Sequence, residues 1–82
     1  MIKVKQLANN QFIIQHDDIE YLQSYDSIIV KRFKQGISHL DKTYWNYSKT
    51  TSKYRNQFLG ETTKETQAKI DSGEYVLTDL NA

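Results

Sequence analysis

The chain has 82 residues, of which 38% are hydrophobic, 26% are charged and none is cysteine, and its formal net charge is +1. A chain of this length makes one domain with a thin core, because it buries only about 60 to 65% of its unfolded surface. The composition excludes disulfides, thiolate metal ligands and a membrane span, and no apolar run reaches signal-peptide length, so we expect a single cytoplasmic domain over residues 1–82.

Residues 1–42 are predicted to be mainly β-structure. MIKVKQL alternates apolar and basic residues, Asn9-Asn10 offers a turn, and QFIIQ follows as a second strand, which together predict a first hairpin. The next segment, HDDIEYLQSY, leaves two alternatives open. Either Asp17 or Asp18 caps a short helical turn, or the segment is an extended connection.

A second hairpin is predicted further along the chain. DSIIVKRF is rich in β-branched and apolar residues, Lys34-Gln35-Gly36 is typical of a turn with glycine in the left-handed position, and ISHLDK returns as a strand. Neither face of this strand pair is purely apolar, which indicates an exposed edge or a sheet with one covered face.

The hydrophobic period then changes from that of a strand to that of a helix. We predict a helix over residues 48–59, with Ser48 as its N-cap and Gly60 as its left-handed C-terminal residue. Four residues share the helical stripe that is expected to enter the core: Tyr47, Thr51, Tyr54 and Phe58.

A second helix is predicted over residues 63–72. Thr62 and Glu65 match a capping box, in which the hydroxyl caps the helix and the carboxylate reaches back to the cap. Glu65 and Lys69 also form an i, i+4 pair in the favourable order.

The predicted fold class is therefore α+β, with a small antiparallel sheet of about four strands in two hairpins, followed by two short helices. The tail EYVLTDL has strand-like content. Residues 74–80 are thus a candidate for a short C-terminal edge strand.

One part of the chain resembles a known family. YDSIIVKRF and YWNYSKTTSKYRNQFLG, continued by GETTKETQAKIDSGEY, are similar to the signature of short uncharacterised proteins encoded by phages and prophages of Gram-positive bacteria. The similarity covers roughly residues 25–60. It implies a phage origin, a small α+β unit and a place in the cytoplasm of the bacterial host, and it transfers no activity to particular residues.

The sequence offers little to catalysis. His16 beside Asp17 and Asp18 is more typical of a polar turn than of a metal site, and the hydroxyls have no convincing base to activate them. Only three glycines are present, and they lie far apart, so no phosphate-binding loop is predicted. We expect no enzyme, no metal and no cofactor.

A binding surface is the better-supported expectation. Residues 21–58 hold seven Lys or Arg against two Asp, whereas residues 59–82 hold two Lys against five acids. The basic middle is suited to phosphates or an acidic partner, and equally to internal pairing with acidic elements. The candidate partner-binding or nucleic-acid-binding residues are Lys31, Arg32, Lys34, Tyr44, Trp45, Lys49, Ser52, Lys53 and Arg55.

Two functions remain open at this point. The first is a non-enzymatic phage-type accessory protein, a counter-defence inhibitor of the anti-CRISPR kind that binds a host protein or ribonucleoprotein complex engaged in nucleic-acid processing. The alternative is a small regulatory protein that binds nucleic acid through a basic helix face and exposed aromatic rings. In either case we expect no membrane partner, and a monomer or a homodimer.

Overall fold

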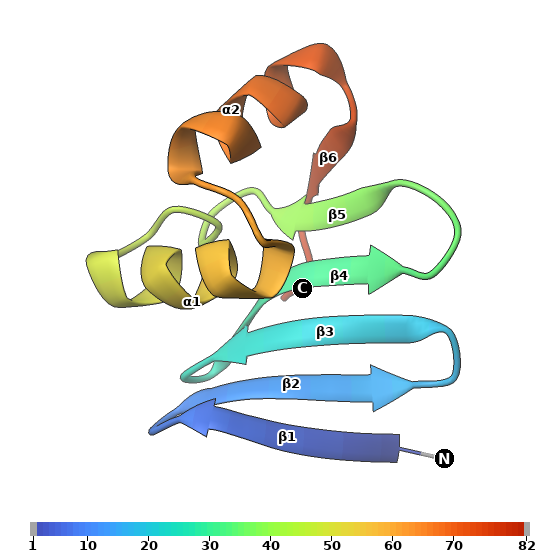
Figure 1. Cartoon of the computed structure of the whole chain (residues 1–82), viewed down its shortest axis with the longest axis vertical. Helices are drawn as coiled ribbons and strands as arrows, with labels where there is room; N and C mark the ends of the chain where they lie inside the picture. Colours follow the sequence, from blue (N-terminus) through green and yellow to red (C-terminus); the bar gives the residue numbers. More distant parts are fainter. Residues whose placement is uncertain (1, 82) are drawn as a thin grey trace.

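One mixed sheet organises the computed structural model, which describes residues 2–81 and contains six strands and two helices there (Figure 1). The strands are neighbours in chain order: β1 (Ile2–Ala8), β2 (Gln11–His16), β3 (Ile19–Ser24), β4 (Ser27–Phe33), β5 (Ser38–Asp41) and β6 (Tyr75–Thr78). Strands β1 to β5 pair antiparallel, whereas β6 is parallel to β5. A parallel pair needs a long crossover, and the crossover carries both helices, α1 (Lys49–Leu59) and α2 (Thr63–Ser72).

The prediction of an antiparallel sheet of about four strands was wrong. The two expected hairpins are present as β1–β2 and β4–β5, but HDDIEYLQSY supplies a further strand, β3, which pairs with both and joins them. The cause is local, because Asp17 adopts a left-handed φ of 56° and reverses the chain in a two-residue turn, so that Ile19 pairs with His16. The tail adds the sixth strand at the edge beside β5.

Both predicted helices are confirmed. Ser48 caps α1 by accepting a hydrogen bond from the Thr51 backbone, and Gly60 ends it with a φ of 70°. Thr62 and Glu65 form the reciprocal capping box of α2. Within residues 2–81, neither helix is long and apolar enough to cross a membrane.

The core lies between the helices and one face of the sheet, which we call the helical face. Leu22, Val30 and Leu40 stand opposite one another on β3, β4 and β5, and each has an exposed fraction of 0%. Phe58 of α1 packs onto them. A bulge in β4 opposite Leu22 lets Ile29 turn inward as well, so that two consecutive residues of β4 are buried.

The opposite face of the sheet carries no helix in the described part of the chain, and we call it the open face. Tyr75, which points to the helical face by its register with Ser38, contacts Lys69 of α2, so α2 lies on the same side of the sheet as α1. The residues after β6 pass behind β4 in Figure 1. There the Asn81 side chain forms two hydrogen bonds with the Ile28 backbone: it donates to the carbonyl oxygen and accepts from the N–H.

Candidate partner-binding site

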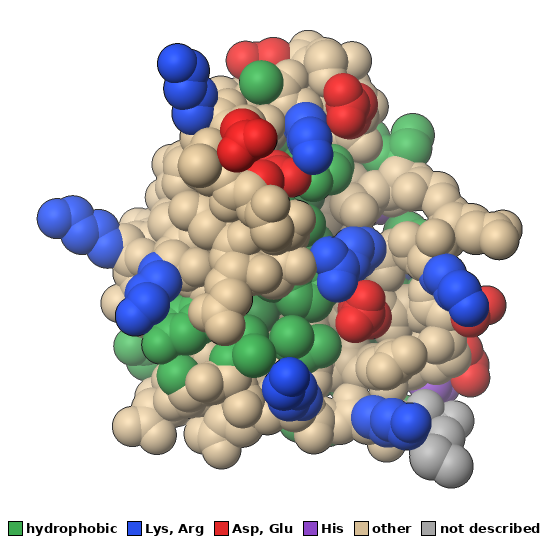
Figure 2. Space-filling view, in the orientation of Figure 1, with side chains coloured by type: hydrophobic (Ala, Val, Ile, Leu, Met, Phe, Trp, Pro, Cys, Tyr) green, Lys and Arg blue, Asp and Glu red, His purple; other side chains and the backbone are tan. Residues whose placement is uncertain are grey.

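A pocket opens at the end of the sheet where the β3–β4 turn faces the loop that precedes α1. Its volume is about 200 Å³. The residues around it include Ser24, Tyr25, Ile29, Tyr44, Tyr47 and Thr51. Because three of them are tyrosines, we call it the tyrosine pocket. Figure 2 shows hydrophobic side chains gathered below α1 on this side of the molecule.

Two buried hydroxyls hold the floor of the tyrosine pocket. Ser24 Oγ on β3 and Thr51 Oγ1 on α1 lie 3.1 Å apart, and both side chains have exposed fractions of only 3%. Ser48 Oγ donates to the same Thr51 oxygen at 3.2 Å. A hydrogen-bonded chain of buried groups is rigid because breaking it leaves polar atoms unsatisfied. The floor therefore fixes the first turn of α1 against the sheet.

Tyr25 forms one wall in an unfavourable backbone conformation. It occupies the first central position of the two-residue β3–β4 turn with a φ of 54°, where glycine is the usual residue. Its side chain is 54% exposed, so burial offers little compensation. Such strain in a bulky residue is characteristic of positions kept for function.

Tyr44 and Tyr47 form the other wall. Their rings meet edge to face with centroids 5.4 Å apart, and Tyr44 also packs against the core. Tyr47 is 70% exposed, so the expectation that it enters the core was wrong. The reason is that Ser48 is the cap, which leaves Tyr47 outside the helix, and the buried stripe begins at Thr51. Thr51 and Phe58 are buried as predicted, and Tyr54 is half-buried.

Arg55 was expected at the surface, but its exposed fraction is 0%. Its guanidinium donates to the carbonyl oxygen of Trp45, to Asn56 Oδ1 at 2.9 Å and to Thr63 Oγ1 at 2.7 Å. Its Cζ lies 5.1 Å from the Trp45 ring. Arg55 therefore joins the loop before α1 to the start of α2, and its full burial removes it from the predicted binding surface, whereas Trp45 is half-buried.

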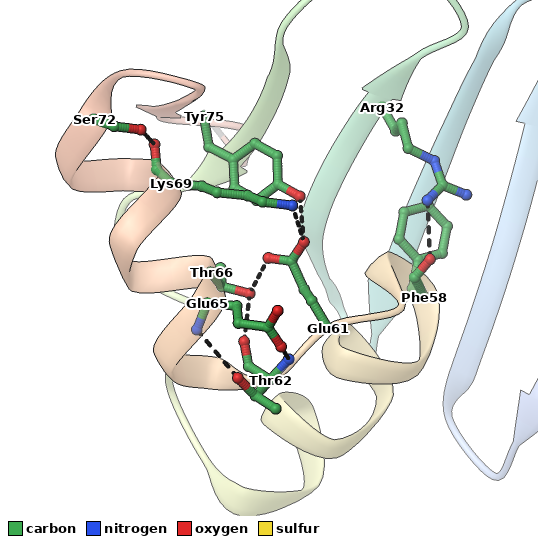
Figure 3. Close-up of polar contacts among 9 residues, drawn as sticks. All are labelled: Arg32, Phe58, Glu61, Thr62, Glu65, Thr66, Lys69, Ser72 and Tyr75. Carbon is green, nitrogen blue, oxygen red and sulfur yellow. Dashed lines mark hydrogen bonds and ion pairs between the residues drawn. The ribbon is translucent and has the colours of Figure 1, made fainter.

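The basic residues of β4 and of the turn after it diverge. Lys31 lies on the open face over two aromatic rings, whereas Arg32 lies on the helical face, where it donates to the Phe58 carbonyl at 2.9 Å (Figure 3) and to Glu20 at 3.0 Å. Lys34 is exposed in the β4–β5 turn. The sheet thus separates three residues that are close in sequence.

The remaining predicted residues lie on α1. Lys49 and Lys53 are exposed, and Ser52 Oγ donates to Asn46 Oδ1 at 2.8 Å, which holds the loop before the helix. In Figure 2 the Lys and Arg side chains are scattered around this face rather than gathered in one patch. The structure brings Tyr44 close to α1 but does not collect the predicted basic residues into a single surface.

Comparison with known proteins adds a family. Residues 1–74 match the sequence profile of a family of unknown function, DUF8033. The chain belongs to this family. No curated protein and no solved structure matches it.

Over residues 2–81 there is no group of three or more His, Cys, Asp or Glu side chains that could hold a metal ion. His16 Nε2 lies 3.5 Å from Asp17 Oδ2, and both side chains are at least half exposed, at 52% and 74%. This arrangement is a polar turn on the surface.

A polar cluster that sequence reasoning missed fastens α2 of the DUF8033 chain to β6 (Figure 3). Glu61, with a side chain only 4% exposed, accepts hydrogen bonds from Lys69 Nζ and Tyr75 Oη at 2.8 Å each and from Thr66 Oγ1 at 2.6 Å. The ion pair of Lys69 is thus with Glu61, eight residues earlier, and not with Glu65. Burial alone would raise the pKa of Glu61, but these hydrogen bonds and the Lys69 charge outweigh it, and the net pKa is lowered.

Proposed function

We propose that this chain is a non-enzymatic binding protein whose tyrosine pocket receives part of a protein partner. The observation that carries the proposal is a pair of highly exposed tyrosines, Tyr25 at 54% and Tyr47 at 70%, on either side of a pocket of about 200 Å³ with a hydrogen-bonded floor. Tyrosine is enriched at protein interfaces because it offers a large, rigid contact area at low entropic cost. A partner that inserts an apolar side chain would bury both rings.

The class of partner follows from the resemblance to short phage proteins. We propose a counter-defence inhibitor, of the anti-CRISPR kind, that occupies a site on a host complex that processes nucleic acid. The acidic C-terminal part supports this, since a basic nucleic-acid channel attracts carboxylates. Glu61 is buried in the Lys69 cluster, so the acids left at the surface of α2 and of the turn after it are Glu65, Asp71 and Glu74.

Direct binding of nucleic acid is the second candidate. Exposed Lys49 and Lys53 lie one turn apart on α1, close in sequence to the exposed ring of Tyr47, and such a combination can stack bases and neutralise phosphates. Burial of Arg55 and the separation of Lys31, which is on the open face, weaken this candidate. The two candidates differ in whether the lysines or the tyrosines carry affinity.

The test is capture of the partner from host lysate on the immobilised full chain, with and without nuclease, followed by affinity measurement with the captured protein. We expect Tyr47→Ala to weaken binding by roughly thirtyfold, because removing an aromatic anchor from an interface costs about 2 kcal/mol. Tyr25→Gly should weaken binding similarly, while stability changes by less than about 1 kcal/mol, because relief of the positive φ offsets the lost contacts.

Ile37→Ala is the matched control. Ile37 is a large apolar side chain with 51% exposure in the β4–β5 connection, at the opposite end of β4 from the tyrosine pocket. Its truncation should leave affinity unchanged. Two results would refute the protein-binding proposal. One is capture that neither tyrosine substitution weakens. The other is capture that is lost on nuclease treatment and in the double variant Lys49→Ala, Lys53→Ala, which would favour direct binding of nucleic acid.

A further inference from the structure

The open face of the sheet is an apolar surface that nothing in the described chain covers along β1, β2 and β3. Register places Val4, Ile14 and Tyr21 side by side across these strands, and the row continues to Lys31 and His39. Val4 is 62% exposed, and Ile2, two residues earlier on the same face, is 64% exposed. β-Branched side chains in this number at the surface of a small domain are typical of an interface.

Charge on the open face is sparse and balanced. Lys31 Nζ lies 5.9 Å from the ring centroid of Tyr21 and 5.2 Å from that of Phe33. Asp79 lines the same hollow, whose volume is about 410 Å³. Over residues 2–81 no ion pair joins Lys31 to Asp79. A hollow lined by one cation and one anion is complementary to a second copy of itself across a twofold axis.

The uncovered part of the open face is large enough for the centre of a small dimer interface. Strands β1, β2 and β3, spaced about 4.8 Å apart and about six residues long at 3.3 Å per residue, cover roughly 300 Å² in projection, and more once side-chain relief is counted. A stable interface buries about 800 Å² on each partner. These three strands supply part of the required area, and the hollow that Lys31 and Asp79 line, together with the flanking turns, supplies the rest.

We propose that the open face is the interface of a homodimer in which two sheets pack face to face about a twofold axis. Two packed sheets lie about 10 Å apart, and their aliphatic side chains interdigitate. The axis sets Lys31 of each copy opposite Asp79 of the other, so that each polar hollow closes on its counterpart. This surface lies on the opposite side of the sheet from the helices, and the tyrosine pocket stays open in the dimer.

The aliphatic character of the face favours a second copy over a nucleic-acid strand. Tyr21 and Phe33 could stack on bases, but Val4 and Ile14 offer no π-surface, and a single lysine beside an acid gives little attraction for phosphates. Sheet-to-sheet packing uses both kinds of side chain.

The experiment is sedimentation equilibrium of the full chain across the micromolar range, where a dimer has twice the monomer mass of 9.7 kDa. We expect Val4→Glu and Lys31→Asp each to weaken self-association by at least about tenfold, because each sets an unpaired charge into the interface. Lys31→Asp combined with Asp79→Lys should restore it. Gln57→Glu, which places the same charge on the exposed surface of α1 on the other side of the sheet, should have no effect, and circular dichroism confirms that each variant is folded.

Three results would overturn the proposal. One is a monomer at every concentration, and another is a dimer that Val4→Glu and Lys31→Asp leave intact, which would place the interface elsewhere. The third is a monomer that binds single-stranded oligonucleotide and loses this binding on Tyr21→Ala, which would assign the face to base stacking. Restoration of association in an equimolar mixture of the Lys31→Asp chain and the Asp79→Lys chain is the decisive supporting result, because in that mixture only a contact between chains pairs the exchanged charges.

Discussion

Arg55 is the residue on which the helical half of the domain depends. Its guanidinium reaches acceptors on the loop before α1 and on the first turn of α2, and burial lowers its pKa while the nearby Glu61 charge opposes that effect. We expect Arg55→Lys to lower the free energy of unfolding by about 2 to 4 kcal/mol, because one ammonium cannot satisfy acceptors on both sides. Urea unfolding measures the loss.

Lys53→Ala is the control, because Lys53 lies on the exposed face of the same helix and its truncation should change stability by less than about 0.5 kcal/mol. Equal losses of stability in the two variants would contradict this role of Arg55.

At the residue scale, the sequence predicts which helical residues are buried better than it predicts which contacts they make. Thr51 and Phe58 follow from helical spacing, because a stripe of that period must face the core. Burial of Arg55 does not follow, since its acceptors come from Trp45 in a loop and Thr63 in the next helix, and periodicity carries no information about either. The exposure of Tyr47 was predictable in part, because Ser48 was already identified as the cap and a residue before the cap lies outside the helix.

At the element scale, the Glu61 cluster makes the docking of α2 on β6 sensitive to acid. The pKa of Glu61 is lowered in the folded chain, so its stabilising contribution is complete above the unfolded value of about 4.3 and is lost as the pH falls through the folded pKa. We expect Glu61→Gln to cost about 2 kcal/mol at pH 7 and to flatten the decline in stability below about pH 4.5. Urea unfolding at a series of pH values measures both effects.

Glu65→Gln serves as the control for this prediction. Glu65 lies in the exposed capping box of α2, and glutamine can still accept a hydrogen bond from the Thr62 backbone. The pH profile of this variant should stay close to that of the parent chain. Identical profiles for Glu61→Gln and the parent chain would mean that the buried carboxylate does not contribute to acid unfolding.

The helices and strands differ in how far their local sequence predicts them. The two helices were predictable to within one residue because their caps, Ser48 and Thr62, act on backbone groups three residues away. Strand β3 was left open because HDDIEYLQSY alternates weakly, and only pairing with neighbours on both sides makes it a central strand. Strand β6 confirms the candidate edge strand at residues 74–80, but its parallel pairing with a strand more than thirty residues earlier leaves no local pattern.

At the scale of the whole molecule, Asp41 joins the beginning of the crossover to the residues that follow β6. With an exposed fraction of 1%, it accepts hydrogen bonds from the backbones of Thr43 at 3.0 Å and Tyr44 at 2.8 Å on one oxygen, and from Leu80 at 2.9 Å on the other. Burial alone would raise the pKa of Asp41, but the hydrogen bonds, that of Leu80 first, lower it overall. The group is therefore a charged acceptor at neutral pH, at the point where the start of the helical crossover meets the residues that follow β6.

Asp41→Asn tests whether this point closes the fold. An amide keeps one acceptor and turns a donor toward a backbone N–H, so we expect a loss of about 2 to 3 kcal/mol in the free energy of unfolding. The sheet order joins β6 to the other strands through β5 alone, and hydrogen exchange should therefore accelerate in β6 and α2 before it accelerates in β2, β3 and β4. Asp26→Asn in the exposed β3–β4 turn should leave exchange in both regions unchanged. If hydrogen exchange accelerated equally in all six strands, the domain would open only as a single cooperative unit. Asp41 would then contribute to global stability and not specifically to the attachment of the residues after β6.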